Sequence, residues 1–171
     1  MLMVNEIKPI YGLTAVIFLL VIFTGAHLVD AGEEREMQGW GLEDPYQRHY
    51  DVAKFKDFKA RVVRVKQVVP MPGMSPAVAL DVRYDDKIIE VQICPTWFAQ
   101  PDEIGIKKGD RINIRGVPVT LNGKDVFIAS KIKRGAYFVL KVRFTKDGRP
   151  FWTMTPEQLA EENEQEREDN W

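Results

Sequence analysis

The sequence predicts a mainly β protein: a small closed Greek-key barrel, preceded by one transmembrane helix and followed by a short acidic C-terminal helix or tail. Three observations carry this prediction. An uncharged apolar stretch occupies residues 10–29, strand-like alternation runs through residues 53–154, and acidic side chains dominate residues 155–171. Residues 1–9 are then an N-terminal stub, and residues 30–52 are an acidic, aromatic linker between the helix and the barrel.

The apolar stretch 10–29 has the length and composition of a membrane span. It holds no Asp, Glu, Lys or Arg, and as a helix it measures about 30 Å, the thickness of a bilayer's hydrocarbon core. A cleaved signal peptide, with a weak cleavage site near Ala31, is the alternative. Such peptides have shorter apolar runs of roughly 7 to 15 residues and a more basic start. The stretch therefore predicts a single-pass protein of the inner (cytoplasmic) membrane, with its soluble domain in the periplasm or otherwise outside the cytoplasm.

The formal charge of −1 hides a strong asymmetry along the chain. Residues 1–51 carry three basic and eight acidic side chains, residues 52–154 carry twenty and ten, and residues 155–171 carry one and seven. A basic domain between acidic arms indicates an electrostatic partner, either another molecule or one of the arms. The alternative is solubility alone, because Lys and Arg alternate with apolar residues as solvent-facing strand positions do.

The periodicity of the central segment is that of β-strands joined by short turns. Residues 77–84 and 87–94 alternate around Asp85-Asp86, which predicts a hairpin with Tyr84 on the core side. Residues 111–121 lead into Asn122-Gly123, the pair that best supplies the positive φ angles of a type I′ turn. The strand that returns after this turn has apolar positions at Val126, Ile128 and Ile132, and a last strand has them at Phe138, Leu140, Val142 and Phe144.

The first strand of the barrel changes phase. Ala60 and Val62 occupy one parity of the alternation, whereas Val63 and Val65 occupy the other, and a β-bulge accounts for such a change. A long bulged strand, a hairpin, a short non-strand segment and two further strands resemble an OB-fold. The run 107–116 (KKGDRINIRG) is similar to the KxGDxVxVxG run that often opens the fourth strand of OB-fold proteins. An immunoglobulin-like sandwich is the alternative.

The OB-fold resemblance brings expectations about function. A single span followed by a periplasmic barrel resembles the haem chaperone of cytochrome c maturation, but the His-x-x-x-Tyr motif of that family is absent here. The two histidines, His27 and His49, lie ahead of the barrel, so no haem is expected. Many OB-folds bind single-stranded nucleic acid with stacked aromatic side chains. Since the second and third strands offer only Tyr84, nucleic acid is not an expected partner.

The inventory of reactive side chains indicates no enzyme. Hydrolytic triads need a His beside a nucleophile, and zinc sites need several Cys or His at set spacings. Two histidines and one cysteine, Cys94, supply neither. Cys94 ends an apolar strand and is interpreted as a small buried hydrophobe. We therefore predict no catalytic residue, no cofactor and no metal site.

Both arms of the barrel, together with its basic residues, are candidates for contact with a partner. Aromatic residues Trp40, Tyr46 and Tyr50 in the linker predict either docking onto a neighbouring subunit or headgroup layer, or packing onto the chain's own barrel. Thr155 and Gln158 predict the capping box of a helix. The full set of predicted docking residues is Trp40, Tyr46, Tyr50, Lys54, Lys56, Arg61, Lys131, Lys133 and Arg134.

These features together predict a non-catalytic, membrane-anchored accessory or scaffold subunit of a larger membrane complex. An electron-transfer assembly, respiratory or photosynthetic, is the expected kind of complex. The expected partners are integral and peripheral membrane subunits, with cytochromes among the candidates, and the lipid bilayer around residues 10–29. A stand-alone periplasmic OB-fold module that binds a small ligand or polyanion is the alternative, and it predicts strongly salt-dependent binding.

Overall fold

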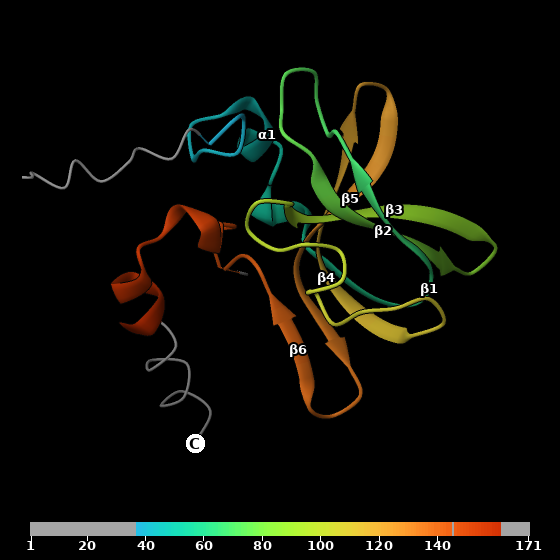
Figure 1. The fold of residues 1–171 in the computed structure, drawn as a ribbon. Coiled ribbons are helices and arrows are strands. Elements are labelled where there is room, and N and C mark those ends of the chain that lie inside the picture. The colour runs from blue at the N-terminus through green and yellow to red at the C-terminus, as the bar shows by residue number, and fades with distance from the viewer. Residues whose placement is uncertain (1–36, 145, 162–171) are drawn as a thin grey trace, which may run out of the picture. The chain divides into compact units, whose positions relative to one another are not determined.

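A computed structural model describes residues 37–144 and 146–161, all of which belong to one unit of the chain, Met37–Trp171 (Figure 1). The described part is mainly β. Its strands are β1 Lys56–Val68, β2 Ala77–Tyr84, β3 Lys87–Pro95, β4 Arg111–Leu121, β5 Lys124–Arg134 and β6 Phe138–Lys141. The helical elements are a short helix α1 at Pro45–Arg48 and 3₁₀ turns at Val52–Lys54 and Phe151–Thr153.

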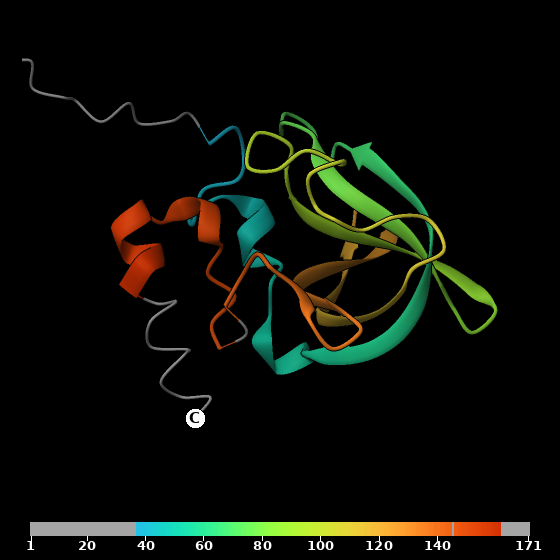
Figure 2. The ribbon, with the colours of Figure 1, turned by 60° about the horizontal axis from the view of Figure 1, so that its bottom comes forward.

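The six strands form one sheet in the order β3-β2-β1-β4-β5-β6. Neighbouring strands in this order are antiparallel, and β3 also pairs with β5 in parallel at Val91–Phe127 and Gln92–Ile128. That extra pairing closes five strands on themselves and leaves β6 attached outside β5. Figure 2 shows the strands curving around a common interior. The result is the OB-like Greek-key arrangement that the sequence predicts.

The predicted hairpins are confirmed. Strands β2 and β3 pair from Ala77–Pro95 to Tyr84–Lys87 across the turn at Asp85. Asn122 and Gly123 join β4 to β5 with φ angles of 51° and 76°, the positive values that a type I′ turn requires. Tyr84 departs from expectation: it is 40% exposed rather than buried. As the last residue of β2 it lies at the rim of the barrel, where the strands no longer cover it.

The predicted bulge in the first strand is also present. The pairing of β1 with β2 shifts register between Val62 and Arg64, so that Val62 pairs with Val82 whereas Val65 pairs with Leu80. The bulge lets one strand belong to both halves of the barrel, since its first half pairs with β4 and its second half with β2. Apolar side chains on either side of the bulge therefore reach the same core.

The connection between β3 and β4 differs from the helix that an OB-fold places there. Residues 96–106 form turns, with no helix among them. Ile104 and Ile106 are nevertheless buried, at 2% and 5% exposure. A few apolar anchors hold this segment against the core without helical hydrogen bonds.

At the C-terminal end, the described residues 156–161 are helical. The predicted capping box is formed: the Thr155 amide donates to Gln158 Oε1 (3.0 Å), and the Gln158 amide donates to Thr155 Oγ1 (3.3 Å). Both Figure 1 and Figure 2 show α1 and the Phe151–Thr153 turn on the same side of the barrel.

The predicted transmembrane helix at residues 10–29 lies outside the described residues, as does the stub before it and most of the acidic tail. Within residues 37–144 and 146–161, no helix has the length and apolar character needed to cross a membrane. The anchor and the side of the membrane that holds the barrel therefore stay predictions from the sequence.

Candidate functional site

The three aromatic residues predicted to dock onto a partner lie in the chain's own core. Trp40, Tyr46 and Tyr50 are 2%, 2% and 7% exposed. The Trp40 ring packs edge-on against Tyr46 and Trp152, with centroids 4.7 and 5.5 Å apart. The Tyr46 hydroxyl donates to Gln92 Oε1 on β3 (2.9 Å). The packing alternative is therefore the one observed, and the docking interpretation is wrong for these side chains because they are buried.

A buried arginine outside the predicted docking set holds this aromatic cluster together. Arg143 is fully buried, and its guanidinium lies 4.5 Å from the ring centroid of Trp152 and 5.4 Å from that of Tyr50. It donates to Gln47 Oε1 and to the Gly148 carbonyl. These contacts join the linker to the segment after β6, so that both pack on the barrel as one body.

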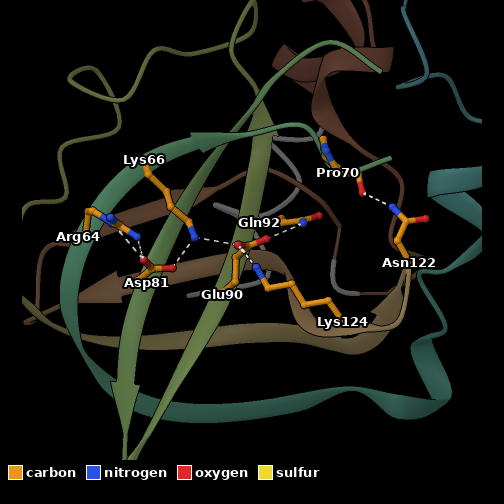
Figure 3. Close-up of polar contacts among 8 residues, drawn as sticks. All are labelled: Arg64, Lys66, Pro70, Asp81, Glu90, Gln92, Asn122 and Lys124. Carbon is orange, nitrogen blue, oxygen red and sulfur yellow. Dashed lines mark hydrogen bonds and ion pairs between the residues drawn. The ribbon is translucent and has the colours of Figure 1, made fainter. Parts of the chain in front are cut away.

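A second set of charged residues forms a paired network on β1, β2, β3 and the β4–β5 hairpin (Figure 3). Glu90 lies at its centre with its side chain only 6% exposed. Glu90 Oε2 accepts from Lys66 Nζ (2.8 Å) and Lys124 Nζ (2.6 Å), and Glu90 Oε1 accepts from Gln92 (3.0 Å). Asp81 accepts from Arg64 (2.5 Å) and lies 2.6 Å from Lys66 Nζ. We call these residues the paired network.

The acids of the paired network are ionised because their partners outweigh their burial. Burial raises the pKa of Glu90, but hydrogen bonds from Lys124, Lys66 and Gln92 outweigh it and bring that pKa down to about 2. Burial acts on Asp81 in the same direction, and its bonds to Lys66 and Arg64 again leave the pKa lowered. Every carboxylate here has a cationic partner, so the network ties strands together rather than leaving charge for a ligand.

A third set of charged residues lies in cross-strand rows on the outer side of β1, β2, β4 and β5. In the first row, Arg61 lies opposite Arg83 on β2 and opposite Arg111 on β4. In the second row, Asn113 lies between Lys59 and Lys133. In the third row, Arg115 lies between Lys131 and Asp57, the one carboxylate in these described rows. We call the cations of these rows the basic face: Lys59, Arg61, Arg83, Arg111, Arg115, Lys131 and Lys133.

The basic face is exposed except at half-buried Lys131, and one carboxylate, Asp57, lies among its cations. Its residues alternate with buried Ile112, Ile114 and Ile132, so they point away from the core. Partial burial lowers the pKa of Lys131, and the nearby charges of Lys133 and Arg115 lower it further. The face is hollowed by a cavity of about 390 Å³ that Lys59, Arg111, Asn113 and Lys133 help to line. Like charges directly opposite each other destabilise a sheet, and in these described rows the ion pair of Arg115 with Asp57 offsets that repulsion at one place.

The other predicted docking residues lie elsewhere. Arg61, Lys131 and Lys133 belong to the basic face, but Lys54 is in the 3₁₀ turn before β1, 3.6 Å from Asp51. Lys56 lines a different cavity. Arg134 donates to Asp110 (2.7 Å) and to the Gly105 carbonyl, and it lies over the Phe138 ring, so its charge is already paired.

Four residues of the basic face are not in the predicted docking set: Lys59, Arg83, Arg111 and Arg115. A signal for three of them was available, because Lys59, Arg111 and Arg115 occupy outward positions of strands whose other parity is apolar. The register between strands was not available from the alternation alone. Only that register aligns Arg83, Arg61 and Arg111 into one row.

The single cysteine lies in the core, as predicted. Cys94 is fully buried, and burial raises the pKa of its thiol to about 12. A thiol in this state is a poor nucleophile and a poor metal ligand at neutral pH. Over residues 37–144 and 146–161, no cluster of His, Cys, Asp and Glu has the geometry to hold a metal ion.

The fold and its charged regions define a small, mainly β protein with an OB-like Greek-key sheet and one basic face. A family model described as the MamS/MamX magnetosome protein family matches residues 54–139, and this chain belongs to that family. Membership supports a membrane-associated accessory role in magnetosome formation. The match begins just before β1 and ends within β6, so it covers the barrel.

Two further comparisons add little. Among curated proteins, none matches this chain. Among solved structures, a chain from "Structure and Conformational Change of a Replication Protein A Heterotrimer Bound to ssDNA" is similar at 14% identity, with a TM-score of 0.38. That match covers 48% of this chain and 58% of that chain. A likeness at this level carries no argument about what this chain binds.

Proposed function

We propose that this protein is a non-catalytic, membrane-anchored accessory protein of the magnetosome that binds an acidic surface of a neighbouring membrane protein through its basic face. Family membership supports the magnetosome as the location. The apolar stretch 10–29 supports anchoring in the membrane, since it is long enough to span a bilayer. An electron-transfer complex with cytochrome subunits stays a prediction from the sequence, and the family match favours the magnetosome over it.

The basic face is the observation that carries this proposal. Cross-strand rows place cations opposite cations, such as Arg83, Arg61 and Arg111, at a cost to the stability of the sheet. In the paired network, by contrast, lysines lie beside a carboxylate, as Lys66 and Lys124 do at Glu90. An acidic partner would relieve the repulsion and gain charge-assisted hydrogen bonds.

The proposal is tested by locating a tagged full-length chain in a magnetosome-forming cell. The test variant is Lys59→Gln with Lys133→Gln, which removes two charges from one row of the basic face. The control is Lys108→Gln with Lys146→Gln, because these lysines are also exposed and lie outside the rows. Magnetosomes are isolated magnetically, solubilised gently and separated on native gels, and the chain is detected in each band.

We expect the wild type and the control to migrate in a band with other membrane proteins and the test variant to leave that band. The wild-type chain should also leave that band as the salt concentration is raised, because salt screens the attraction between the basic face and an acidic partner. Equal retention of the test variant and the control would reject the basic face as the contact. Absence of the wild type from the magnetic fraction would reject the magnetosome as the location.

A further inference from the structure

A cavity of about 470 Å³ lies at the rim of the barrel where β2 turns into β3, and neither the basic face nor the paired network includes it. Residues of five strands, β1 to β5, line it. Three aromatic rings are part of its apolar lining, beside Ile88, Ile89, Pro118 and Val126. The Phe58 ring lies 5.0 Å, centroid to centroid, from both Tyr84 and Phe127, edge-on to each. We call this opening the barrel mouth.

The barrel mouth exposes apolar side chains to solvent. Tyr84 is 40% exposed and Ile88 is 50% exposed, although both belong to strands whose other residues are largely buried. Phe127, by contrast, is 3% exposed. An apolar recess with a few polar groups at its edge is the usual form of a small-molecule site, and such sites range over roughly 300–1,000 Å³.

The charges at the edge of the barrel mouth favour an anion. Lys56 and Lys87 both line the mouth and are exposed, and among the described residues neither side chain makes a hydrogen bond or ion pair. Of the two carboxylates at the edge, Asp57 is neutralised by Arg115 (2.5 Å), whereas Asp125 accepts a hydrogen bond from the neutral Thr120 hydroxyl (2.7 Å) and keeps its charge. Two lysines without an ion pair among the described residues therefore face one such carboxylate, which leaves the edge positive by one charge.

We propose that the barrel mouth binds a small organic anion with a flat aromatic body. The ring of the ligand packs among Phe58, Tyr84 and Phe127, and its acid group lies between Lys56 and Lys87. Aromatic side chains in edge-on pairs favour a further ring over a flexible chain, because ring edges and faces carry complementary partial charges. The size of the cavity suits one or two fused rings and excludes a folded peptide.

The experiment is titration calorimetry of the full-length chain in nanodiscs of zwitterionic lipid, with empty nanodiscs as the blank. The probe is 2-naphthoate. Its neutral analogue 2-naphthalenemethanol tests the need for charge, and decanoate tests whether an acyl chain serves as well as a ring. The variants are Lys56→Gln with Lys87→Gln, and Tyr84→Leu. The matched control is again Lys108→Gln with Lys146→Gln.

We expect saturable binding of 2-naphthoate at one site, and binding at least about tenfold weaker for the neutral analogue and for the Lys56→Gln, Lys87→Gln variant. Tyr84→Leu should weaken binding, and the control should not. Because the two lysines are exposed, their replacement leaves the barrel folded, which circular dichroism checks. Equal affinity in the wild type and the lysine variant, equal affinity for decanoate, or no saturable binding would each overturn the proposal. The result is independent of the basic face and of the cellular location.

Discussion

The paired network and the basic face use the same residue types on the same barrel in opposite ways. In the network, each of Lys66 and Lys124 lies within 3 Å of a carboxylate whose side chain is almost buried. On the basic face, Arg61 has an arginine opposite it on each side. The cations that meet Glu90 or Asp81 therefore hold strands together, whereas those of the Arg83, Arg61 and Arg111 row have no carboxylate opposite them.

The comparison also separates stability from binding. Buried carboxylates must keep their partners, because an unpaired buried charge is costly. Exposed like charges cost the fold a little and gain it nothing. Substitutions in the network should therefore change unfolding, whereas substitutions on the basic face should change association.

The largest expected effect is that of Glu90→Gln. The variant keeps the size of the side chain but leaves Lys66 and Lys124 without their shared carboxylate. We expect the free energy of unfolding to fall by about 2–3 kcal/mol, the range for breaking a largely buried charged hydrogen bond. Urea unfolding of the full-length chain in nanodiscs, followed by tryptophan fluorescence, measures it.

The matched control for this prediction is Asp86→Asn, which removes an exposed carboxylate at the tip of the β2–β3 hairpin. Its effect should stay within about 0.5 kcal/mol. Equal losses in the two variants would show that the network contributes no more to stability than a surface charge.

The next effect is the dependence of stability on pH. The pKa of Glu90 is lowered from its ordinary value of 4.5 to about 2, and that of Asp81 is also lowered. As the pH falls, the unfolded chain therefore takes up protons at these two groups before the folded chain does. Their contribution is complete above about pH 5 and is lost as the pH falls towards 2. Urea midpoints measured at steps of pH should fall over this window.

The Glu90→Gln variant supplies the comparison for the pH series, because it lacks the most strongly shifted group. Its stability should fall less steeply with decreasing pH than that of the wild type. Parallel curves for the two proteins would contradict the assignment of this pH dependence to the paired network.

The smallest expected effect is a gain in stability from Lys131→Gln on the basic face. Partial burial and the charges of Lys133 and Arg115 lower the pKa of Lys131, which means that its charged form is disfavoured in the fold. Removing the charge should raise the free energy of unfolding by up to about 0.5 kcal/mol. The control Lys146→Gln should change nothing. A loss of stability in Lys131→Gln would show that Lys131 has an attractive partner and that the basic face is not purely repulsive.

Much of the barrel was predictable because its signals are local. Alternation with period two marks the strands, Asn122-Gly123 marks a turn by its backbone preference, and the phase change after Val62 marks the bulge. The short non-strand segment between β3 and β4 was predicted as well, but its conformation was not: residues 96–106 form turns around buried Ile104 and Ile106.

The candidate site was predictable only in part, because it depends on what lies opposite each residue. Alternation placed Lys131 and Lys133 outward, yet it could not show that Arg134 is paired with Asp110 or that Tyr84 lies at an open rim. The aromatic residues of the linker suit docking onto a partner and packing onto the barrel equally well in the sequence. The structure shows packing, because Arg143, distant in sequence, contacts Tyr46, Tyr50 and Trp152 in one buried cluster.

The mainly β class, the turns, the bulge, the capped helix at Thr155 and the concentration of positive charge in residues 52–154 can all be predicted from the amino-acid sequence, since each depends on neighbours along the chain. Which charges are neutralised, which aromatic side chains are buried and where the barrel opens can be seen in the folded structure alone, because charge pairing and burial depend on contacts between strands. Those contacts follow from the register and closure of the sheet, which local periodicity does not specify.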